Sequence, residues 1–550
     1  MAAAGALALV HLAWLLAHFA PAIMSADANG YVVQARLIAT EGHTWFATES
    51  PAQFVGMHWL EASPGVFHSR YPAGLPMLMA AAWKIGGLTG ALLINPLLAS
   101  ATVLLVFFLA RPLAGHACAL IAAAVVAAIP VTNHHALDAD AHIAAAFFLV
   151  ASVLALRRFA NAPKIAWGLA AGVCLAIVPT IRYPEAVAVL AAAAWLAWRV
   201  RPLWRAWPVV AGAAIPLGVL LAHNRAAYGA LWRTGYALTN EQTGFGLGHF
   251  LDHAAPYVLS LCAQGPVLYF AFGVAGLAAL VIDRRRRPDG VLFAGIVVPL
   301  VMVYMAYYWG GPGAGTSAIG GNMRFFIPTF PFFATAGAWL LYRLSQHLGD
   351  SGRAAVGVVA ALQLLVTGPT SEQVLERSEG TRSSAARARA LAETQVPRGS
   401  VLILDYPMDE SLDAVGRWRI VEESLVAGTG GRDGPSKGGR PPGPGGGPAD
   451  VEDNRPRPRQ VGKNRGQLEH YAGLSPSARA QRAWADLAGW AGGRAIYWLT
   501  HSPDALENTL PAGAASERVA EVDAPAIGFR VAGANASAKL RLVRITLPRR

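Results

Sequence analysis

The sequence predicts a multi-span α-helical membrane protein with about eleven transmembrane helices, followed by a C-terminal α/β domain. Of its 550 residues, 54% are hydrophobic and only 14% are charged, a composition unlike that of soluble globular proteins. Apolar runs of about 20 residues, the length that spans a bilayer, recur as far as residue 368 and then stop. The chain therefore divides into a transmembrane domain, 1–368, and a more polar domain, 369–550.

Short polar connections separate the apolar runs and set the predicted helix ends. The first run resembles a signal sequence, but no Lys or Arg precedes it, so a retained helix is favoured. The segment "YPAGLPMLMAAAWKIGG", 71–87, is amphipathic and bracketed by Pro and Gly, and it is predicted to lie at the membrane interface. The predicted spans are residues 3–22, 89–110, 115–130, 141–156, 165–180, 184–199, 207–223, 262–282, 290–308, 326–342 and 353–368.

The basic residues set the predicted orientation, because short cytoplasmic loops collect Lys and Arg. With the N-terminus inside, Arg157, Arg158 and the run 284–287 fall on the cytoplasmic side. The formal net charge of +12 then follows from topology, and no nucleic-acid partner is expected. The sequence thus predicts a multi-pass protein of the cell (inner or plasma) membrane. Its predicted extracytoplasmic segments are the first outer loop, 23–88, then 131–140, 181–184, 224–261, 309–325 and the whole C-terminal domain.

The C-terminal region alternates predicted helices with apolar strands, which is typical of an α/β layer structure. The segments "SVLILDY", 400–406, and "RAIYWLT", 494–500, are predicted to form buried strands. Between them, residues 427–466 are rich in Gly and Pro and contain almost no apolar side chains. Because such a segment buries too little surface to order itself, it is predicted to be a disordered insertion.

Acidic residues gather in the predicted outer loops, and Asp27 follows the first span directly. The segment from Asp27 through Tyr31 and Ile38 has helical spacing and predicts a short helix. A purely structural role for Asp27 is the alternative, because Asp is a favourable N-cap residue. Nevertheless, a carboxylate placed at an outer helix end is what a site at the membrane surface requires.

Five short segments resemble, in order, motifs of the GT-C glycosyltransferases. The relevant branch contains the dolichyl- or polyprenyl-phosphate-mannose protein mannosyltransferases and the aminoarabinose transferases. Each motif is short and hydrophobic, but their order and sidedness agree with that family over roughly residues 1–345. The segments are Asp27 with the later "RYPAGLPMLMA", then "NHHALDADAHIAAAFFLVASVLAL", "GLAAGVCLAIVPTIRYPEAVAVL", "NRAAYGALWRTGY" and "NMRFFIPTFPFFATAGAWLL".

The resemblance implies transfer of a sugar from a polyprenyl-phosphate donor to an extracytoplasmic acceptor, with inversion at the anomeric carbon. The family uses an outer-loop aspartate as its catalytic carboxylate, and Asp27 is the matching residue. Transfer needs a base for the acceptor hydroxyl and cations for the departing phosphate, whose oxygens suit guanidinium groups. The residues expected at the donor phosphate are Arg182, Arg324, Tyr71 and Arg70, with lipid snorkelling as the alternative for the arginines. Those expected at the acceptor or sugar are Tyr31, Glu185, Tyr236 and Arg233.

A second acidic site is expected in "NHHALDADAH", 133–142, where the family has a carboxylate shortly before a helix. The spacing to the apolar run favours Asp140 over Asp138. This carboxylate would orient the acceptor, assist Asp27, or bind a divalent metal ion together with His134 and His135. Adjacent loop histidines are more often interfacial polar residues than ligands, so a metal cofactor stays open.

The alternative from another class is a transporter or flippase of a lipid-linked sugar. Transporters usually bury ionisable groups near the bilayer midplane, whereas here the predicted span interiors carry almost none. A catalytically silent scaffold is a third hypothesis. The expected partners are a polyprenyl-phosphate-linked sugar, membrane lipids and an acceptor that is a lipid, a protein or a polysaccharide.

Overall fold

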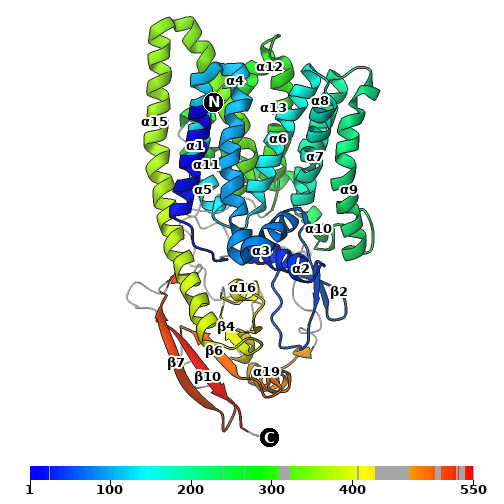
Figure 1. The fold of residues 1–550 in the computed structure, drawn as a ribbon, viewed down its shortest axis with the longest axis vertical. Coiled ribbons are helices and arrows are strands. Elements are labelled where there is room, and N and C mark those ends of the chain that lie inside the picture. The colour runs from blue at the N-terminus through cyan, green and yellow to red at the C-terminus, as the bar shows by residue number, and fades with distance from the viewer. Residues whose placement is uncertain are drawn as a thin grey trace.

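A computed structural model gives the fold (Figure 1). A bundle of long helices carries two shorter helices, a small sheet and the C-terminal domain at one end, here called the domain-facing end. The N-terminus lies at the opposite end of the bundle. The structure describes residues 1–550 except 24, 240, 265–266, 309–321, 406–407, 428–469, 502–508, 525, 528–529, 532–538 and 549–550. The predicted insertion, 427–466, therefore lies almost entirely outside the described residues.

Helices occupy every predicted span, with ends that differ by several residues. Their apolar faces form one continuous hydrophobic core, as expected for helices rich in Ala, Leu and Val. The bundle helices are α1 (Ala2–Ala17), α4 (Ile94–Ala127), α6 (Ala141–Asn161), α7 (Ile165–Ile181), α8 (Ala186–Arg199), α9 (Trp207–Tyr228), α11 (Leu247–Gln264), α12 (Val267–Ile282), α13 (Arg287–Met305) and α15 (Phe330–Gln395). Short elements between them are α5 (Pro130–Ala136), η1 (Tyr183–Glu185), η2 (Leu203–Ala206), α10 (Gly235–Leu238), η3 (Glu241–Gly244) and η4 (Asn322–Thr329).

Two of the long helices break at a glycine with positive φ. Gly115 in α4 has φ +72°, and Gly349 in α15 has φ +61°, a backbone region that other residues rarely adopt. Figure 1 shows α15 turning over at the end of the bundle far from the C-terminal domain. Each break separates two of the predicted spans.

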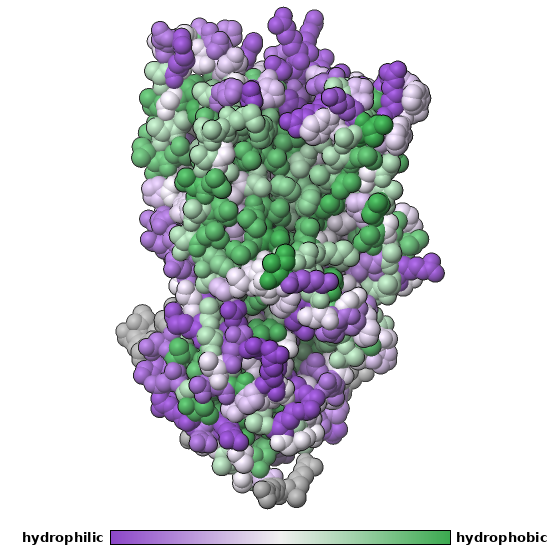
Figure 2. Space-filling model, in the orientation of Figure 1, coloured by the Kyte–Doolittle hydropathy of each residue, from purple (hydrophilic) through white to green (hydrophobic). Residues whose placement is uncertain are grey.

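Six described segments are long and apolar enough to cross a membrane, and Figure 2 shows an apolar band on the visible face of the bundle between hydrophilic ends. One of the six, α3 (Gly74–Leu92), breaks at Gly86 and Gly87 and lies across the domain-facing end in Figure 1. The interfacial position of this segment stays a prediction. The other five segments are Ile94–Ala127, Ala141–Asn161, Leu203–Tyr228, Arg287–Met305 and Asn322–Gln395.

A three-stranded antiparallel sheet lies in the first outer loop, in the order β1-β3-β2. Trp59 and Phe67 are fully buried there and join one hydrophobic cluster with α2 (Ala26–Thr40) and α3. Aromatic residues suit a half-buried pleated surface, so this loop forms a compact platform against the bundle. Its strands are β1 (Trp45–Ala47), β2 (Trp59–Ser63) and β3 (Val66–Ser69).

The C-terminal domain contains a five-stranded mixed sheet, in the order β5-β4-β6-β10-β7. Leu402 and Leu404 pack on the end of α15, whereas Val401 and Ile403 pack on the opposite layer with α19. Strand side chains alternate between the two faces of a sheet, so a strand that is covered on both faces needs a continuous apolar run. The strands predicted at 400–406 and 494–500 are present as β4 and β6. The elements are β4 (Val401–Leu404), α16 (Met408–Asp413), β5 (Arg419–Glu422), α17 (Glu423–Val426), α19 (Pro476–Ala491), β6 (Ile496–Thr500), β7 (Ala515–Asp523) and β10 (Lys539–Thr546), beside a short pair, β8 (Ala526–Ile527) and β9 (Arg530–Val531).

Direct contacts join the C-terminal domain to the first outer loop. Helix α15 runs through residue 368 without interruption, so the proposed domain boundary falls inside it. The Asn29 side chain donates to the backbone carbonyl of Glu410 at 2.8 Å, and the Phe54 amide donates to the Ile420 carbonyl at 2.8 Å. Helix α16 therefore rests on α2, the helix that carries Asp27.

Candidate active site

Helix α2 presents Asp27 in its first turn. The N-cap residue is Ser25, whose side chain accepts a hydrogen bond from the Ala28 amide at 3.2 Å. Asp27 is thus not needed as the cap, and its carboxylate points instead to other side chains. The α2 helix dipole adds a favourable positive potential at this position.

Three side chains hold the Asp27 carboxylate. The Tyr71 hydroxyl donates to Oδ1 at 2.7 Å, His58 Nε2 lies 2.9 Å from the same oxygen, and Arg324 donates to Oδ2 at 3.0 Å. Burial opposes the charge on Asp27, but Arg324 and His58 outweigh it and hold the pKa of Asp27 well below its usual value. The side chain keeps 36% of its surface exposed, so a ligand can reach it.

Aromatic rings line the space beside Asp27. Tyr31 stacks on Tyr71 with ring centroids 4.4 Å apart, and Tyr236 meets Tyr71 edge-on at 6.2 Å. Arg70 lies over both Tyr71 and Tyr236 and pairs with Glu241 at 2.7 Å. Burial and the charge of Asp27 raise the pKa of Tyr71 well above its usual value, so its hydroxyl remains a hydrogen-bond donor.

Close approach of Tyr71 depends on a glycine in α2. A Cβ atom added at Gly30 would lie 2.8 Å from Cδ2 of Tyr71 and 2.9 Å from Cε2. Glycine lowers helix stability at a mid-helix position, yet here it makes room for the ring that bonds Asp27. Gly30, in the local sequence "DANG", 27–30, therefore lowers the stability of α2 but allows Tyr71 to reach Asp27.

Arg182 reaches the same site from the end of α7. It is 7% exposed, and its Nε donates to Glu185 Oε1 at 2.8 Å. Tyr304 donates to the same carboxylate oxygen at 2.7 Å and accepts from Arg182 at 3.2 Å. The positive charge of Arg182 acts on the hydroxyls of Tyr31 and Tyr236, which places it beside the tyrosine cluster.

The two aspartates before α6 have different surroundings. Asp140 caps α6 by accepting from the His142 amide at 2.9 Å, and His135 Nδ1 lies 2.8 Å from its other oxygen. Asp140 also interacts electrostatically with Arg324. By contrast, burial raises the pKa of Asp138, and its side chain accepts from the adjacent Ala139 amide. Asp138 also accepts from the hydroxyl of Ser25, the N-cap residue of α2, at 3.4 Å, so both aspartates have a link to the Asp27 region.

The remaining predicted residues lie outside this cluster. His134 Nδ1 is 2.7 Å from the Ser378 hydroxyl, directed toward α15. Arg233 is exposed and donates to the Tyr228 carbonyl at 3.2 Å. Within the described part of the chain, no three His, Cys, Asp or Glu side chains are grouped as metal ligands. Of the candidate set in the "NHHALDADAH" loop, His135 and Asp140 contact each other, whereas His134 is directed toward Ser378.

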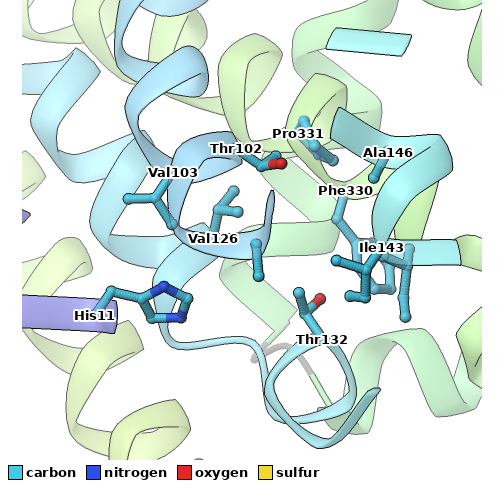
Figure 3. Close-up of a pocket in the computed structure, with 11 residues that line it drawn as sticks. His11, Thr102, Val103, Val126, Thr132, Ile143, Ala146, Phe330 and Pro331 are labelled. Carbon is cyan, nitrogen blue, oxygen red and sulfur yellow. The ribbon is translucent and has the colours of Figure 1, made fainter. Parts of the chain in front are cut away.

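A small hollow inside the bundle is separate from this cluster (Figure 3). Figure 3 shows His11, Thr102 and Thr132 among apolar side chains. His11 contacts the side chains of Asn133 at 3.0 Å and Ser100 at 2.9 Å. This polar network fixes α5, and through it the loop that carries Asp140.

Three contacts of the site were not predicted from the sequence. His58 lies in the long loop "QFVGMHWLEA", where no periodicity distinguishes it. Tyr304 belongs to a predicted span. Arg382 lies on α15 beyond the last predicted span and donates to the His134 carbonyl, in the loop that carries Asp140, at 3.1 Å. Only the tertiary structure brings these residues to the site.

Known proteins resemble this chain in sequence and in fold. Residues 72–224 match the family model described as dolichyl-phosphate-mannose-protein mannosyltransferase. The fold resembles ArnT from Cupriavidus metallidurans bound to undecaprenyl phosphate, with 12% identity, coverage of 98% of this chain and 97% of that chain, and a TM-score of 0.59. ArnT in the apo state matches with the same identity and coverage and a TM-score of 0.57. The search of curated proteins finds no match.

These matches show a fold shared with ArnT, and the resemblance to the GT-C superfamily indicated by the five motifs is confirmed. The matched family model covers part of the membrane domain, whereas the likeness to ArnT extends over nearly the full length. The Archaeoglobus fulgidus oligosaccharyltransferase is also similar, with 12% identity, coverage of 76% of this chain and 64% of that chain, and a TM-score of 0.45.

Proposed function

We propose that the protein is a glycosyltransferase that moves a sugar from a polyprenyl-phosphate donor to an acceptor on the extracytoplasmic face of the membrane. The observation that carries the proposal is the convergence of Asp27, Arg324, Arg182 and Asp140 at the domain-facing end of the bundle. The similar ArnT structure contains undecaprenyl phosphate, which supports a lipid-phosphate donor.

In the proposed reaction, Asp27 takes the proton of the acceptor hydroxyl as that oxygen attacks the anomeric carbon. The bond between the sugar and the phosphate oxygen breaks, and its electron pair stays on the phosphate. One direct displacement inverts the anomeric configuration. Arg182 and Arg324 stabilise the departing phosphate through charge-assisted hydrogen bonds.

Arg324 connects donor binding to the state of Asp27. This guanidinium pairs with the Asp27 carboxylate at 3.0 Å, which makes Asp27 a weak base. A donor phosphate that takes up part of the Arg324 charge would leave Asp27 more basic. The proposed base thus gains strength when the donor arrives.

The C-terminal domain is proposed to cover the mouth of the site on the extracytoplasmic side and to help select the acceptor. Its support is the contact of α16 with α2, two residues from Asp27. A transporter or flippase is the weaker alternative, because the candidate charged groups gather at one end of the bundle rather than at its middle. No described feature favours the transporter over the transferase.

The deciding experiment compares wild type with Asp27→Asn in nanodiscs containing a panel of polyprenyl-phosphate sugars. Wild type should transfer the sugar or hydrolyse the donor, and Asp27→Asn should lose at least about 100-fold in rate while it still binds the donor. The control is Asp252→Asn, an exposed carboxylate on α11, which should keep wild-type activity. Binding without any cleavage by wild type would favour the transporter.

A further inference from the structure

His58 is the one imidazole, among the described residues, that contacts the Asp27 carboxylate. Its Nε2 lies 2.9 Å from Asp27 Oδ1, a distance at which an imidazole N–H donates to a carboxylate. The side chain is only 12% exposed. The Tyr71 ring meets the imidazole edge-on, with ring centroids 5.2 Å apart, so the imidazole contacts both Asp27 and Tyr71.

The backbone around His58 is fixed from two sides. The His58 carbonyl accepts from the Arg70 amide at 2.9 Å, which ties the residue to the segment that carries Tyr71. Four residues earlier, the Phe54 amide donates to the Ile420 carbonyl of the C-terminal domain at 2.8 Å. The C-terminal domain therefore helps to fix the backbone of the segment that carries His58.

Several charged and titratable groups surround the imidazole. Burial is the largest influence and, with the charge of Arg70, outweighs the carboxylates of Asp27 and Glu241 to lower the pKa of His58. At neutral pH the ring is consequently uncharged. The groups that face it or its immediate neighbours are Asp27 and Tyr31 on α2, Arg70 and Tyr71 after β3, Tyr236 on α10, Glu241 on η3, Arg324 on η4, and Glu410 on α16 beside Gly56.

We propose that His58 is a positioning residue for the transfer reaction: its neutral ring orients the Asp27 carboxylate, and its protonated ring weakens Asp27 as a base. The proposal rests on the proposed function of Asp27. A protonated ring would place a second full positive charge beside a carboxylate that already pairs with Arg324. Since a base loses strength when cations surround its anionic form, turnover should fall when His58 gains its proton.

The first test is the pH dependence of sugar transfer between about pH 4.5 and 8, a range above the titration of Asp27. Wild-type kcat/KM should fall about tenfold per pH unit below the titration of His58. In His58→Gln, whose amide still donates to Asp27, the rate should stay within about twofold across the range. The matched control is His43→Gln, since His43 contacts Glu41 and Trp45 in the same loop and should keep the wild-type profile.

The second test needs no activity, so it remains decisive if wild type proves not to be a transferase. Nuclear magnetic resonance of labelled histidines, with the His58 signal assigned through His58→Gln, measures its titration midpoint directly. In Asp27→Asn, loss of the carboxylate charge should lower that midpoint by about 1 pH unit or more. An unchanged midpoint, or a wild-type activity profile in active His58→Gln, would overturn the proposal.

Discussion

Asp27 contacts three donors, which differ in the oxygen they contact and in their charge. The hydroxyl of Tyr71 and the imidazole of His58 orient Oδ1, whereas the charge of Arg324 stabilises the anion through Oδ2. Because the pKa of Asp27 lies well below its usual value, the carboxylate is ionised throughout the neutral and mildly acid range. An activity loss near pH 6 would therefore originate from another group.

Replacement of Gly30 tests how closely Tyr71 must approach. Alanine should stabilise the helix itself by up to about 1 kcal/mol, but its Cβ would collide with the Tyr71 ring at 2.8 Å. Gly30→Ala should therefore lower transfer by about 10- to 100-fold through displacement of Tyr71 from Asp27. Rates of purified variants check this, with Gly5→Ala as control because a Cβ there meets nothing within 4 Å. Equal activity of both variants would contradict the role of Tyr71.

The charged residues of the candidate site carry more signal in the sequence than their neighbours. Asp27 is expected from the family resemblance and from its place after the first span, and Arg182 and Arg324 because basic residues are scarce at outer helix ends. His58 could not be recognised, because it is one of three histidines in the 66-residue outer segment 23–88 and no periodic signal distinguishes it from His43 and His68. The contact of Tyr304 with Arg182 and Glu185 likewise depends on long-range packing that the local sequence does not encode.

Among the elements, the outer sheet contains a histidine buried in its neutral form. His68 on β3 is 8% exposed, and burial, aided by the charge of His43, lowers its pKa to about 4. The unfolded segment binds a proton below its ordinary pKa of 6.5, which the folded segment does not accept until about pH 4. The stability of the folded sheet is accordingly lost as the pH falls through this window.

Hydrogen exchange across residues 45–69 checks this pH dependence. Between pH 6.5 and 4, the opening free energy of the sheet should fall by up to about 1.4 kcal/mol per pH unit. In His68→Gln, which has no titrating ring, most of that dependence should disappear. If wild type and variant lose protection in parallel, another group governs the acid sensitivity of the sheet.

Helix positions were predictable because apolar runs of spanning length have few alternatives to helix in lipid. The sequence could not show how those helices pair, nor that α11 would begin at Leu247 inside a predicted outer loop. The strands β4 and β6 were predictable from their uninterrupted apolar residues. Conversely, β1 has only three residues, too few for a pattern to be distinguished from chance.

At the scale of the whole molecule, Asn29 connects the C-terminal domain to the site. Its side chain is fully buried, donates to the Glu410 carbonyl, and accepts from Trp59 Nε1 at 3.3 Å. Asn29→Ala would leave both partners unsatisfied, at a cost of about 1–3 kcal/mol each. Hydrogen exchange should therefore accelerate in 408–426, with a parallel loss of transfer activity.

The control for Asn29 is Gln53→Ala, which removes a solvent-exposed hydrogen bond to the Glu49 amide in the same loop. Exchange in 408–426 should stay at the wild-type rate in this variant. Unchanged exchange in Asn29→Ala would mean that other contacts suffice to dock α16 on α2. In that case the C-terminal domain would reach the site independently of this residue.

Helix α15 is unbroken from Gly349 to Gln395, so it sets the distance between the bundle and the C-terminal domain as well as connecting them. An α-helix rises about 1.5 Å and turns about 100° per residue, so its length fixes both the height and the rotational phase of the C-terminal domain relative to the helix bundle. One inserted residue would swing the domain about a third of a turn away from α2, and seven would nearly restore its direction while lifting it by about 10 Å. If the proposed function holds, the clearance available to an acceptor is set by a count of residues far from Asp27.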